Sequence, residues 1–170
     1  PGTEKQAEAL QAGLGNGFKV FIAMRYWHPF AGDVARDVAS WGPDRVILLP
    51  LYPQFSTTTT ESFSMAWTPA AAAAGLNVPT SAICCWPEAD GFIDAVARAT
   101  DAAIAKLPAQ TPYRILFSAH GLPKKIVDAG DPYASHVQRT AASGRFRLAE
   151  PDADSALSYP IRVRPRGGPA

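Results

Sequence analysis

A short apolar run decides the fold: Arg45-Val46-Ile47-Leu48-Leu49-Pro50-Leu51. Its centre carries no polar side chain on either face, which is typical of a parallel strand that is covered on both sides. The breakers Gly42-Pro43-Asp44 stand directly before it. We therefore expect a buried strand here, in a parallel sheet flanked by helices.

Strand-like runs alternate with helical patterns on either side of this stretch. We expect three further strands, over residues 18–24, 80–85 and 113–118. Helices are expected over residues 33–41, from Ser56 or a following threonine towards residue 74, and over 90–107. The alternation predicts an α/β fold with a Rossmann-like parallel sheet. In such sheets, ligands bind at the carboxyl ends of the strands.

The composition excludes several classes of protein. The 170 residues are 47% hydrophobic and 18% charged, which is typical of a globular domain rather than a disordered chain. A net charge of +1 gives no support for binding nucleic acid or an anionic membrane. No apolar run approaches the roughly 18 residues of a membrane span. The adjacent Cys84 and Cys85 form no disulfide framework, favour a reducing compartment, and are expected at the buried end of a strand.

Unusual residues follow three of the expected strands. Arg25-Tyr26-Trp27-His28-Pro29-Phe30 combines a cation, aromatic rings and an imidazole, and Tyr52-Pro53-Gln54-Phe55-Ser56 leads into a row of threonines. Such hydroxyls at the start of a helix can cap the helix or hold an anion. His120, beside Gly121, is expected to emerge at a strand end where a ligand can approach closely, and His136 is expected on a helix surface. Dinucleotide, P-loop, serine-hydrolase and structural-zinc motifs are absent from the sequence.

These segments resemble the ferrochelatase family. The resemblance lies in Ile115-Leu116-Phe117-Ser118-Ala119-His120-Gly121-Leu122-Pro123 with Gly130-Asp131-Pro132-Tyr133, in Leu49-Pro50-Leu51-Tyr52-Pro53-Gln54-Phe55-Ser56, and in Arg25-Tyr26. It implies a chelatase-type fold of two Rossmann-like halves with a porphyrin cleft between them. It also implies insertion of Fe2+ into protoporphyrin IX in the cytoplasm, with iron as a substrate and no organic cofactor. An iron–sulfur cluster and peripheral membrane association are left open.

The resemblance also implies roles for individual residues. His120 matches the active-site histidine, which is assigned to pyrrole proton abstraction, metal binding or both. Arg25, Tyr52 and Ser56 match substrate-binding positions that line the porphyrin. Asp131 and Tyr133 are expected to support the loop that follows His120.

Family members are about twice as long as this chain, so we expect a partial α/β domain over residues 1–133 that is inactive by itself. Over residues 134–170 we expect the start of a helix and then an irregular tail rich in arginine and proline, which we interpret as the product of a frameshift or sequencing error. Two alternatives remain from sequence: a cobalt or nickel tetrapyrrole chelatase, and a flavodoxin-like binding module without catalysis.

Overall fold

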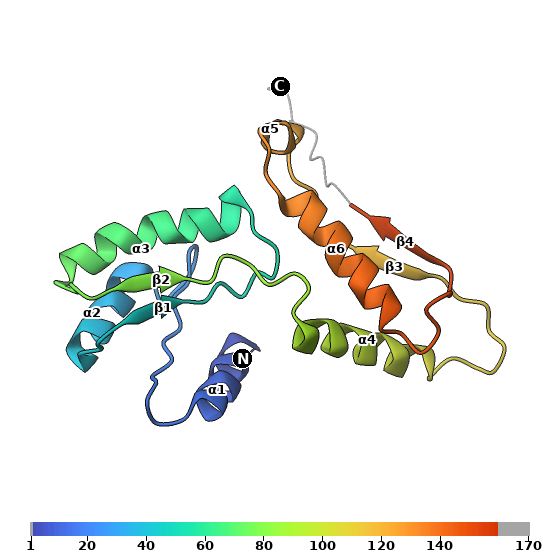
Figure 1. The fold of residues 1–170 in the computed structure, drawn as a ribbon, viewed down its shortest axis with the longest axis horizontal. Coiled ribbons are helices and arrows are strands. Elements are labelled where there is room, and N and C mark those ends of the chain that lie inside the picture. Colours follow the sequence, from blue (N-terminus) through green and yellow to red (C-terminus); the bar gives the residue numbers. More distant parts are fainter. Residues whose placement is uncertain (1, 160–170) are drawn as a thin grey trace, which may run out of the picture. The chain divides into compact units, whose positions relative to one another are not determined.

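The computed structural model describes residues 2–159, which form helices and short parallel strands in two compact units (Figure 1). Unit 1 comprises the residues up to Tyr52 together with Thr57–Cys84, and unit 2 comprises Pro53–Ser56 and the residues from Cys85 onward. The elements follow the order α1 (Gly2–Leu14), α2 (Ala31–Trp41), β1 (Val46–Leu48), η1 (Thr57–Glu61), α3 (Ser62–Ala73), β2 (Thr80–Ala82), α4 (Asp90–Ile104), β3 (Ile115–Ser118), α5 (Lys124–Asp128), α6 (Tyr133–Phe146) and β4 (Ser155–Ser158).

Unit 1 is built around the apolar run of residues 45–51, which contains β1. Strand β1 pairs in parallel with β2, and Val46 lies opposite Thr80. The helix α2 ends at Gly42, whose φ of 72° is a left-handed conformation that glycine adopts without steric cost. The expected helix that starts near Ser56 is present as a single turn of π-helix, η1, followed by α3.

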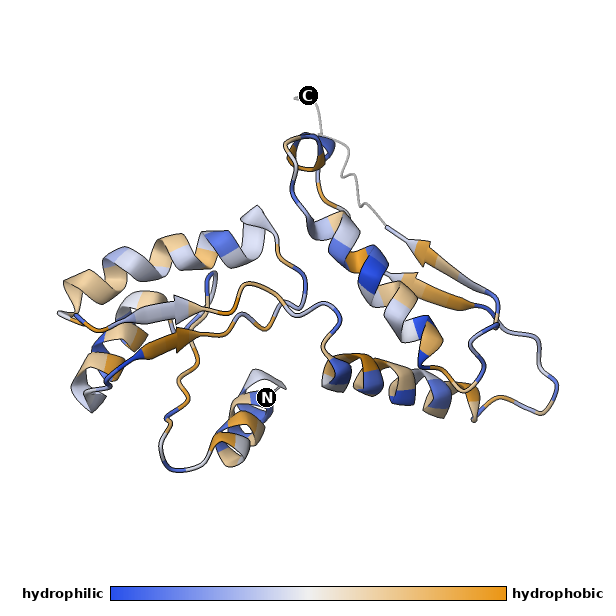
Figure 2. Cartoon of the chain, viewed as in Figure 1, coloured by the Kyte–Doolittle hydropathy of each residue, from blue (hydrophilic) through white to orange (hydrophobic). Residues whose placement is uncertain are grey.

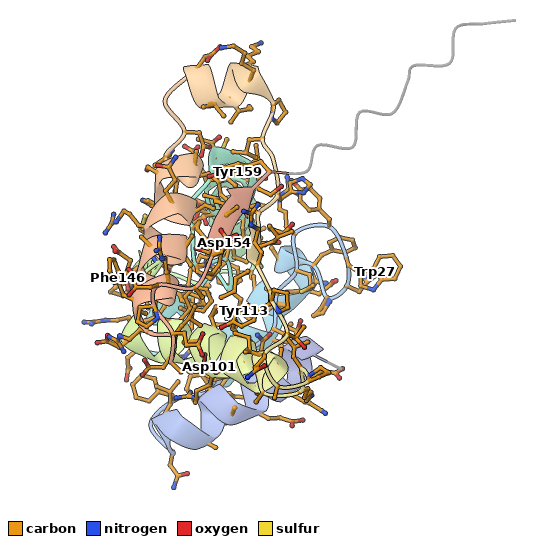
Figure 3. The ribbon with its side chains drawn as sticks, turned by 90° about the vertical axis from the view of Figure 1, so that its right-hand side faces the viewer. Trp27, Asp101, Tyr113, Phe146, Asp154 and Tyr159 are labelled. Atoms are coloured by element: carbon orange, nitrogen blue, oxygen red, sulfur yellow. The ribbon has the colours of Figure 1, made fainter. Side chains whose placement is uncertain are left out.

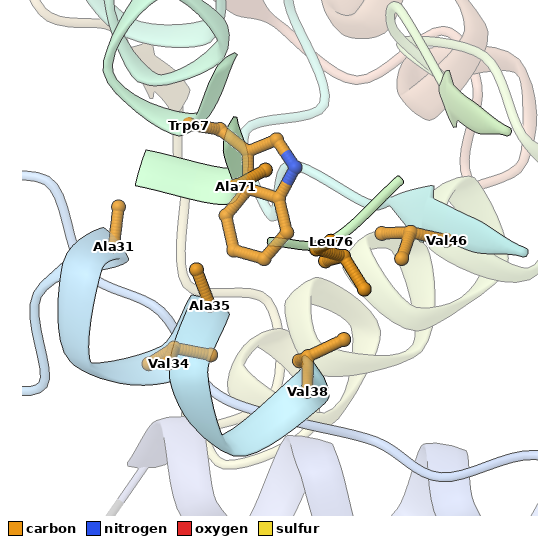
Figure 4. Close-up of a cluster of buried hydrophobic side chains, with 8 residues drawn as sticks. All are labelled: Ala31, Val34, Ala35, Val38, Val46, Trp67, Ala71 and Leu76. Carbon is orange, nitrogen blue, oxygen red and sulfur yellow. The ribbon is translucent and has the colours of Figure 1, made fainter. Parts of the chain in front are cut away.

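The hydrophobic core of unit 1 joins α2, α3 and β1 (Figure 4). Its largest member is Trp67, which is 3% exposed. The α2 residues in the cluster are spaced so that they fall on one face of the helix: Ala31, Val34, Ala35 and Val38. Burial of that face fixes α2 and α3 against the sheet.

Unit 2 repeats the parallel pairing with strands β3 and β4, in the register Ile115 to Ser155. The helix α6 packs closely on this sheet, since a Cβ placed on Gly144 would lie 3.7 Å from Cε1 of Phe117. The helix α4 has hydrophilic residues on one side and hydrophobic residues on the other (Figure 2). Arg147, at the end of α6, forms ion pairs with Asp90 and Asp94 of α4.

The α/β class with parallel strands between helices is confirmed, but the strand expected over residues 18–24 does not form. Its backbone is held instead by one side chain of α1: Gln11 Nε2 donates to the Phe18 carbonyl at 3.0 Å, and Val20 N–H donates to Gln11 Oε1 at 2.8 Å. A strand needs a hydrogen-bonded neighbour, and among the described residues this segment has only the isolated bridge from Met24 to Phe30.

The chain beyond residue 133 is more regular than expected as far as it is described. The helix α6 continues to Phe146, and β4 follows where we expected an irregular tail. The frameshift interpretation concerned the tail within residues 134–170, of which residues 160–170 lie outside the described residues. The cysteines also differ from expectation: β2 ends at Ala82, Cys84 is exposed and Cys85 is half-buried.

Candidate functional site

A pocket of about 240 Å³ opens at the carboxyl end of β3, within unit 2. One wall consists of strand residues Phe117, Ser118, Ala119 and His120, and the remaining lining comes from the Pro53–Ser56 segment, α6 and β4. The other lining residues are Gln54, Tyr133, Val137, Thr140, Ala141 and Leu157. The lining therefore combines apolar side chains with the polar groups of Gln54, Ser118, His120, Tyr133 and Thr140, which could orient a small molecule.

His120 is the titratable group best placed in this pocket. Strand pairing continues one residue past β3, because Ala119 N–H donates to the Ser158 carbonyl at 2.9 Å, so the backbone is held up to the histidine. Ser118 and His120 are both exposed, as the two-residue period of a strand predicts, and both line the pocket together with Phe117 and Ala119. Across residues 2–159, no hydrogen bond engages the His120 imidazole, which leaves its nitrogens available to a ligand.

Tyr133 closes the loop that follows His120. Its phenol is hydrogen-bonded to the His120 backbone, and burial raises the pKa of Tyr133 above its ordinary value while that hydrogen bond acts in the opposite direction. Asp131 fastens the same loop, since its Oδ1 accepts the Tyr133 N–H at 2.9 Å. The loop thus turns back on the strand end and limits how far the His120 backbone can move.

Ser56 lies inside unit 2, beside the loop that follows His120. It is 1% exposed, and its hydroxyl donates to Oδ2 of Asp131 at 3.0 Å. Asp131 is itself buried. In this structure Ser56 is therefore a hydrogen-bond partner of Asp131.

Tyr159 is a neighbour of the pocket that the sequence did not single out. It follows β4, and its hydroxyl lies 3.4 Å from the Ala134 carbonyl (Figure 3). Burial raises the pKa of Tyr159, and the nearby Tyr133 phenol raises it further. The Tyr159 phenol therefore lies near the Tyr133 phenol, which is bonded to the His120 backbone. The sequence offered little signal for it, since the preceding residues Ser155-Ala156-Leu157-Ser158 show no strand alternation.

The second group of predicted site residues belongs to unit 1. Arg25 is exposed, and its Nε donates to the Ser62 carbonyl at 3.2 Å and to Ser62 Oγ at 3.0 Å. Its guanidinium carbon lies 4.8 Å from the centre of the Tyr26 ring. These contacts hold the side chain at the start of α3 and leave its terminal nitrogens without a hydrogen bond to any residue in the described part of the chain.

Aromatic side chains around Arg25 are open to solvent. Tyr26 is 70% exposed, and Trp27, at 72%, points away from the ribbon (Figure 3). Tyr52, which follows β1, is 51% exposed. Aromatic faces and a free guanidinium fork suit a flat ligand that carries carboxylates.

Residues 2–159 contain no cluster of three or more histidine, cysteine, aspartate or glutamate side chains that could hold a metal ion. None of the helices in this part of the chain combines the length and apolar character needed to cross a bilayer.

A pocket at the carboxyl end of a parallel strand, with an exposed imidazole on its wall, is the place where α/β proteins commonly bind ligands. Comparison with known proteins makes the class more specific. The family model described as Ferrochelatase matches residues 1–166. The chain is 46% identical over 170 residues to the ferrochelatase of Caulobacter vibrioides, covering 97% of this chain and 48% of that protein. The Phenylobacterium zucineum ferrochelatase gives the same values, and that of Rickettsia bellii is 40% identical over 167 residues, covering 96% of this chain and 45% of its own length.

The chain belongs to the ferrochelatase family. It spans about half the length of the curated relatives that it matches. The match extends to residue 166, well beyond Tyr133, where the recognisable motifs of the sequence end. The regular structure of α6 and β4 agrees with that extension.

Proposed function

We propose that these residues carry part of the active site of an enzyme that inserts Fe2+ into protoporphyrin IX to form protohaem, the last step of haem synthesis. One observation supports this most directly: in a chain of the ferrochelatase family, the free imidazole of His120 lies on the wall of a pocket at the end of β3. Iron is a substrate in this reaction. The proposed enzyme is a lyase, and we expect it to need no organic cofactor.

His120 is proposed as the catalytic residue. Insertion of Fe2+ releases two pyrrole protons, so the site needs a proton acceptor near the porphyrin nitrogens. A neutral imidazole titrates near neutral pH and is also a ligand for Fe2+. One nitrogen cannot accept a proton and bind iron simultaneously, so the two roles are alternatives or successive steps at the same atom.

Arg25 and Tyr52 are proposed as porphyrin-binding residues. The free guanidinium nitrogens of Arg25 can form a paired hydrogen bond with a propionate, and the exposed ring of Tyr52 can stack on the macrocycle. Ser56 is proposed as a structural partner of Asp131, and Asp131 and Tyr133 as supports of the His120 loop.

We expect the enzyme in the cytoplasm, with protoporphyrin IX and Fe2+ as partners and without nucleic acid. The family match favours the iron enzyme over a cobalt or nickel chelatase and over a flavin-binding module.

The proposal is tested in a chimera, because residues 1–170 alone are expected to give no turnover. These residues replace the matching segment of the Caulobacter vibrioides relative, which is 46% identical to them. Metalloporphyrin absorbance is followed under anaerobic conditions with Fe2+ and protoporphyrin. We expect turnover by the chimera, and a loss of about 100-fold or more in kcat for His120→Ala, the scale of losing a general base.

His28→Ala serves as the matched control, since His28 is an exposed histidine of unit 1. The circular dichroism spectrum of each variant shows whether it has folded. A folded His120→Ala chimera that keeps more than a tenth of the activity would remove His120 from the chemistry. Faster insertion of Co2+ or Ni2+ than of Fe2+ would favour the alternative chelatase.

A further inference from the structure

The Pro53–Ser56 segment is fastened to α6 and the residues just before it at three successive positions. Gln54 Nε2 donates to Thr140 Oγ1 at 2.9 Å, and Phe55 N–H donates to His136 Nδ1 at 3.2 Å. Ser56 completes the series with its bond to Asp131. His136 and Thr140 are four residues apart, so they lie on one face of the helix, one turn from each other.

The bond to His136 differs from the other two because its acceptor is an imidazole nitrogen. An imidazole accepts at Nδ1 only when that nitrogen carries no proton, so the proton of neutral His136 stands on Nε2. The Phe55 N–H is partly buried and has no other hydrogen-bond acceptor among the described residues. Removal of the His136 imidazole would therefore leave the Phe55 N–H without an acceptor.

Thr140 extends the same connection into the pocket. Its hydroxyl can donate to the Pro87 carbonyl at 2.7 Å or to the His136 carbonyl at 3.0 Å, while its oxygen accepts the Gln54 amide. Gln54 and Thr140 both line the His120 pocket. The place of the Pro53–Ser56 segment against α6 therefore decides where the Gln54 amide stands on the pocket wall.

We infer that His136 is a positioning residue: through Nδ1 it holds the Phe55 backbone against α6 and so sets Gln54 opposite the β3 wall that carries His120. His136 touches no reacting atom in this scheme and acts through Phe55 and Gln54. That this arrangement helps to bind porphyrin rests on the proposed function. The hydrogen bond from Phe55 to His136, and its effect on the position of Gln54, are independent of that function.

The test compares two substitutions in the 170-residue chain. His136→Leu removes the acceptor at similar volume, whereas His136→Asn keeps an oxygen acceptor at the δ position. We expect hydrogen exchange at the Phe55 amide to rise roughly tenfold in His136→Leu, the scale of losing one partly buried hydrogen bond. In His136→Asn it should return to within about threefold of the unsubstituted chain. The Ala97 amide, inside α4, should keep its protection in both variants.

Two NMR measurements complete the test without porphyrin. In the unsubstituted chain at neutral pH, the 15N shift of His136 Nδ1 should be that of an unprotonated nitrogen. The ring 15N resonances of His120 should move in His136→Leu and return in His136→Asn. A protonated Nδ1, or an unchanged Phe55 exchange rate in folded His136→Leu, would overturn the inference. If the Ala97 amide also loses its protection in His136→Leu, that variant has lost its fold. The 15N shift of His136 Nδ1 in the unsubstituted chain then decides whether the inference holds.

Discussion

The two units use similar elements but are held together by different interactions. Unit 1 has the larger hydrophobic core, centred on Trp67 and the buried face of α2. Unit 2 joins its elements with a buried polar pair and several ion pairs, whereas unit 1 also uses the exposed hydrogen bonds of Arg25 to Ser62. The contacts in unit 2 are the buried Ser56–Asp131 pair and the ion pairs Arg147–Asp90, Arg147–Asp94, Arg139–Glu88 and Arg114–Asp154.

This difference between apolar and polar contacts affects which unit can hold the side chains of a functional site in fixed positions. The hydrophobic effect is non-directional, whereas a hydrogen bond sets the angle and distance between one donor and one acceptor. The His120 pocket lies in the unit where hydrogen bonds decide position. We therefore expect mutations of apolar residues to have their largest effect on the stability of unit 1, and mutations of polar residues to act on the pocket of unit 2.

The largest effect on stability is expected from Trp67→Ala. Trp67 is almost fully buried, and truncation of such a side chain costs about 3–5 kcal/mol in the free energy of unfolding. Urea unfolding followed by circular dichroism measures the loss. The exposed Trp27 provides the control, with an expected change within about 0.5 kcal/mol for Trp27→Ala. A cost below about 1 kcal/mol for Trp67→Ala would show that this core does not hold unit 1.

A smaller loss is expected from Asp131→Ala in unit 2. The substitution leaves the Ser56 hydroxyl and the Tyr133 N–H without their carboxylate, at a cost of about 2–3 kcal/mol. Adding Ser56→Ala to it should cost much less than Ser56→Ala alone, which a double-mutant cycle in urea measures. Asp128→Ala, which breaks only an exposed pair with Lys124, should change stability by less than about 0.5 kcal/mol. Additive costs for the two residues would refute their coupling.

Tyr52→Ala should weaken binding of protoporphyrin by about 1–2 kcal/mol, because one aromatic stacking face is lost. Tyr52→Phe keeps that face and should bind as the unsubstituted chain does. Quenching of porphyrin fluorescence in the chimera measures both affinities. Equal affinities for the alanine and phenylalanine variants would mean that the ring does not contact the porphyrin, which would leave unit 1 with Arg25 as its proposed contact.

The smallest effect is expected from Arg147→Met, which removes the ion pairs to Asp90 and Asp94 but keeps an apolar stem. The hydrogen bonds to these two carboxylates raise the pKa of Arg147 above its ordinary value. Because these groups are exposed, we expect a shift of the urea midpoint smaller than that of Asp131→Ala. The shift should vanish in 1 M NaCl, where the screening length is about 3 Å. A shift that persists at high salt would show that lost packing, rather than charge, is responsible.

The sequence predicts a strand most clearly where its own run of apolar residues marks it. Val46–Leu48 and Ile115–Ser118 are apolar enough to be recognised without knowledge of a partner. Strand β4 has only Ala156 and Leu157 as apolar residues, and its strand conformation depends on pairing with β3. The opposite error occurred at residues 18–24, where an apolar run forms no strand because Gln11 binds its backbone.

The residues of the candidate site also differ in whether the sequence alone could identify them. His120 could be found because glycine and a strand end mark it in the sequence, and Tyr133 stands in a recognisable motif. Gln54 and His136 could not be placed, since the bonds of Gln54 and Phe55 to α6 join residues more than 80 positions apart. One signal was available for His136: it adjoins the buried Val137 and lies four residues before Thr140, on a helix face that packs inward.

The membership of Pro53–Ser56 in unit 2 has a consequence for the order of folding. The chain on both sides of this segment belongs to unit 1, so the segment leaves the ribosome with the first unit although its partners lie in the second. Ser56 is separated from Asp131 by 75 residues. At a synthesis rate of 5–20 residues per second, that separation corresponds to a wait of roughly 4–15 s. During this interval the core around Trp67 can form while the residues that will line the pocket still have no partner, and the pocket is completed only after α6 has been synthesised.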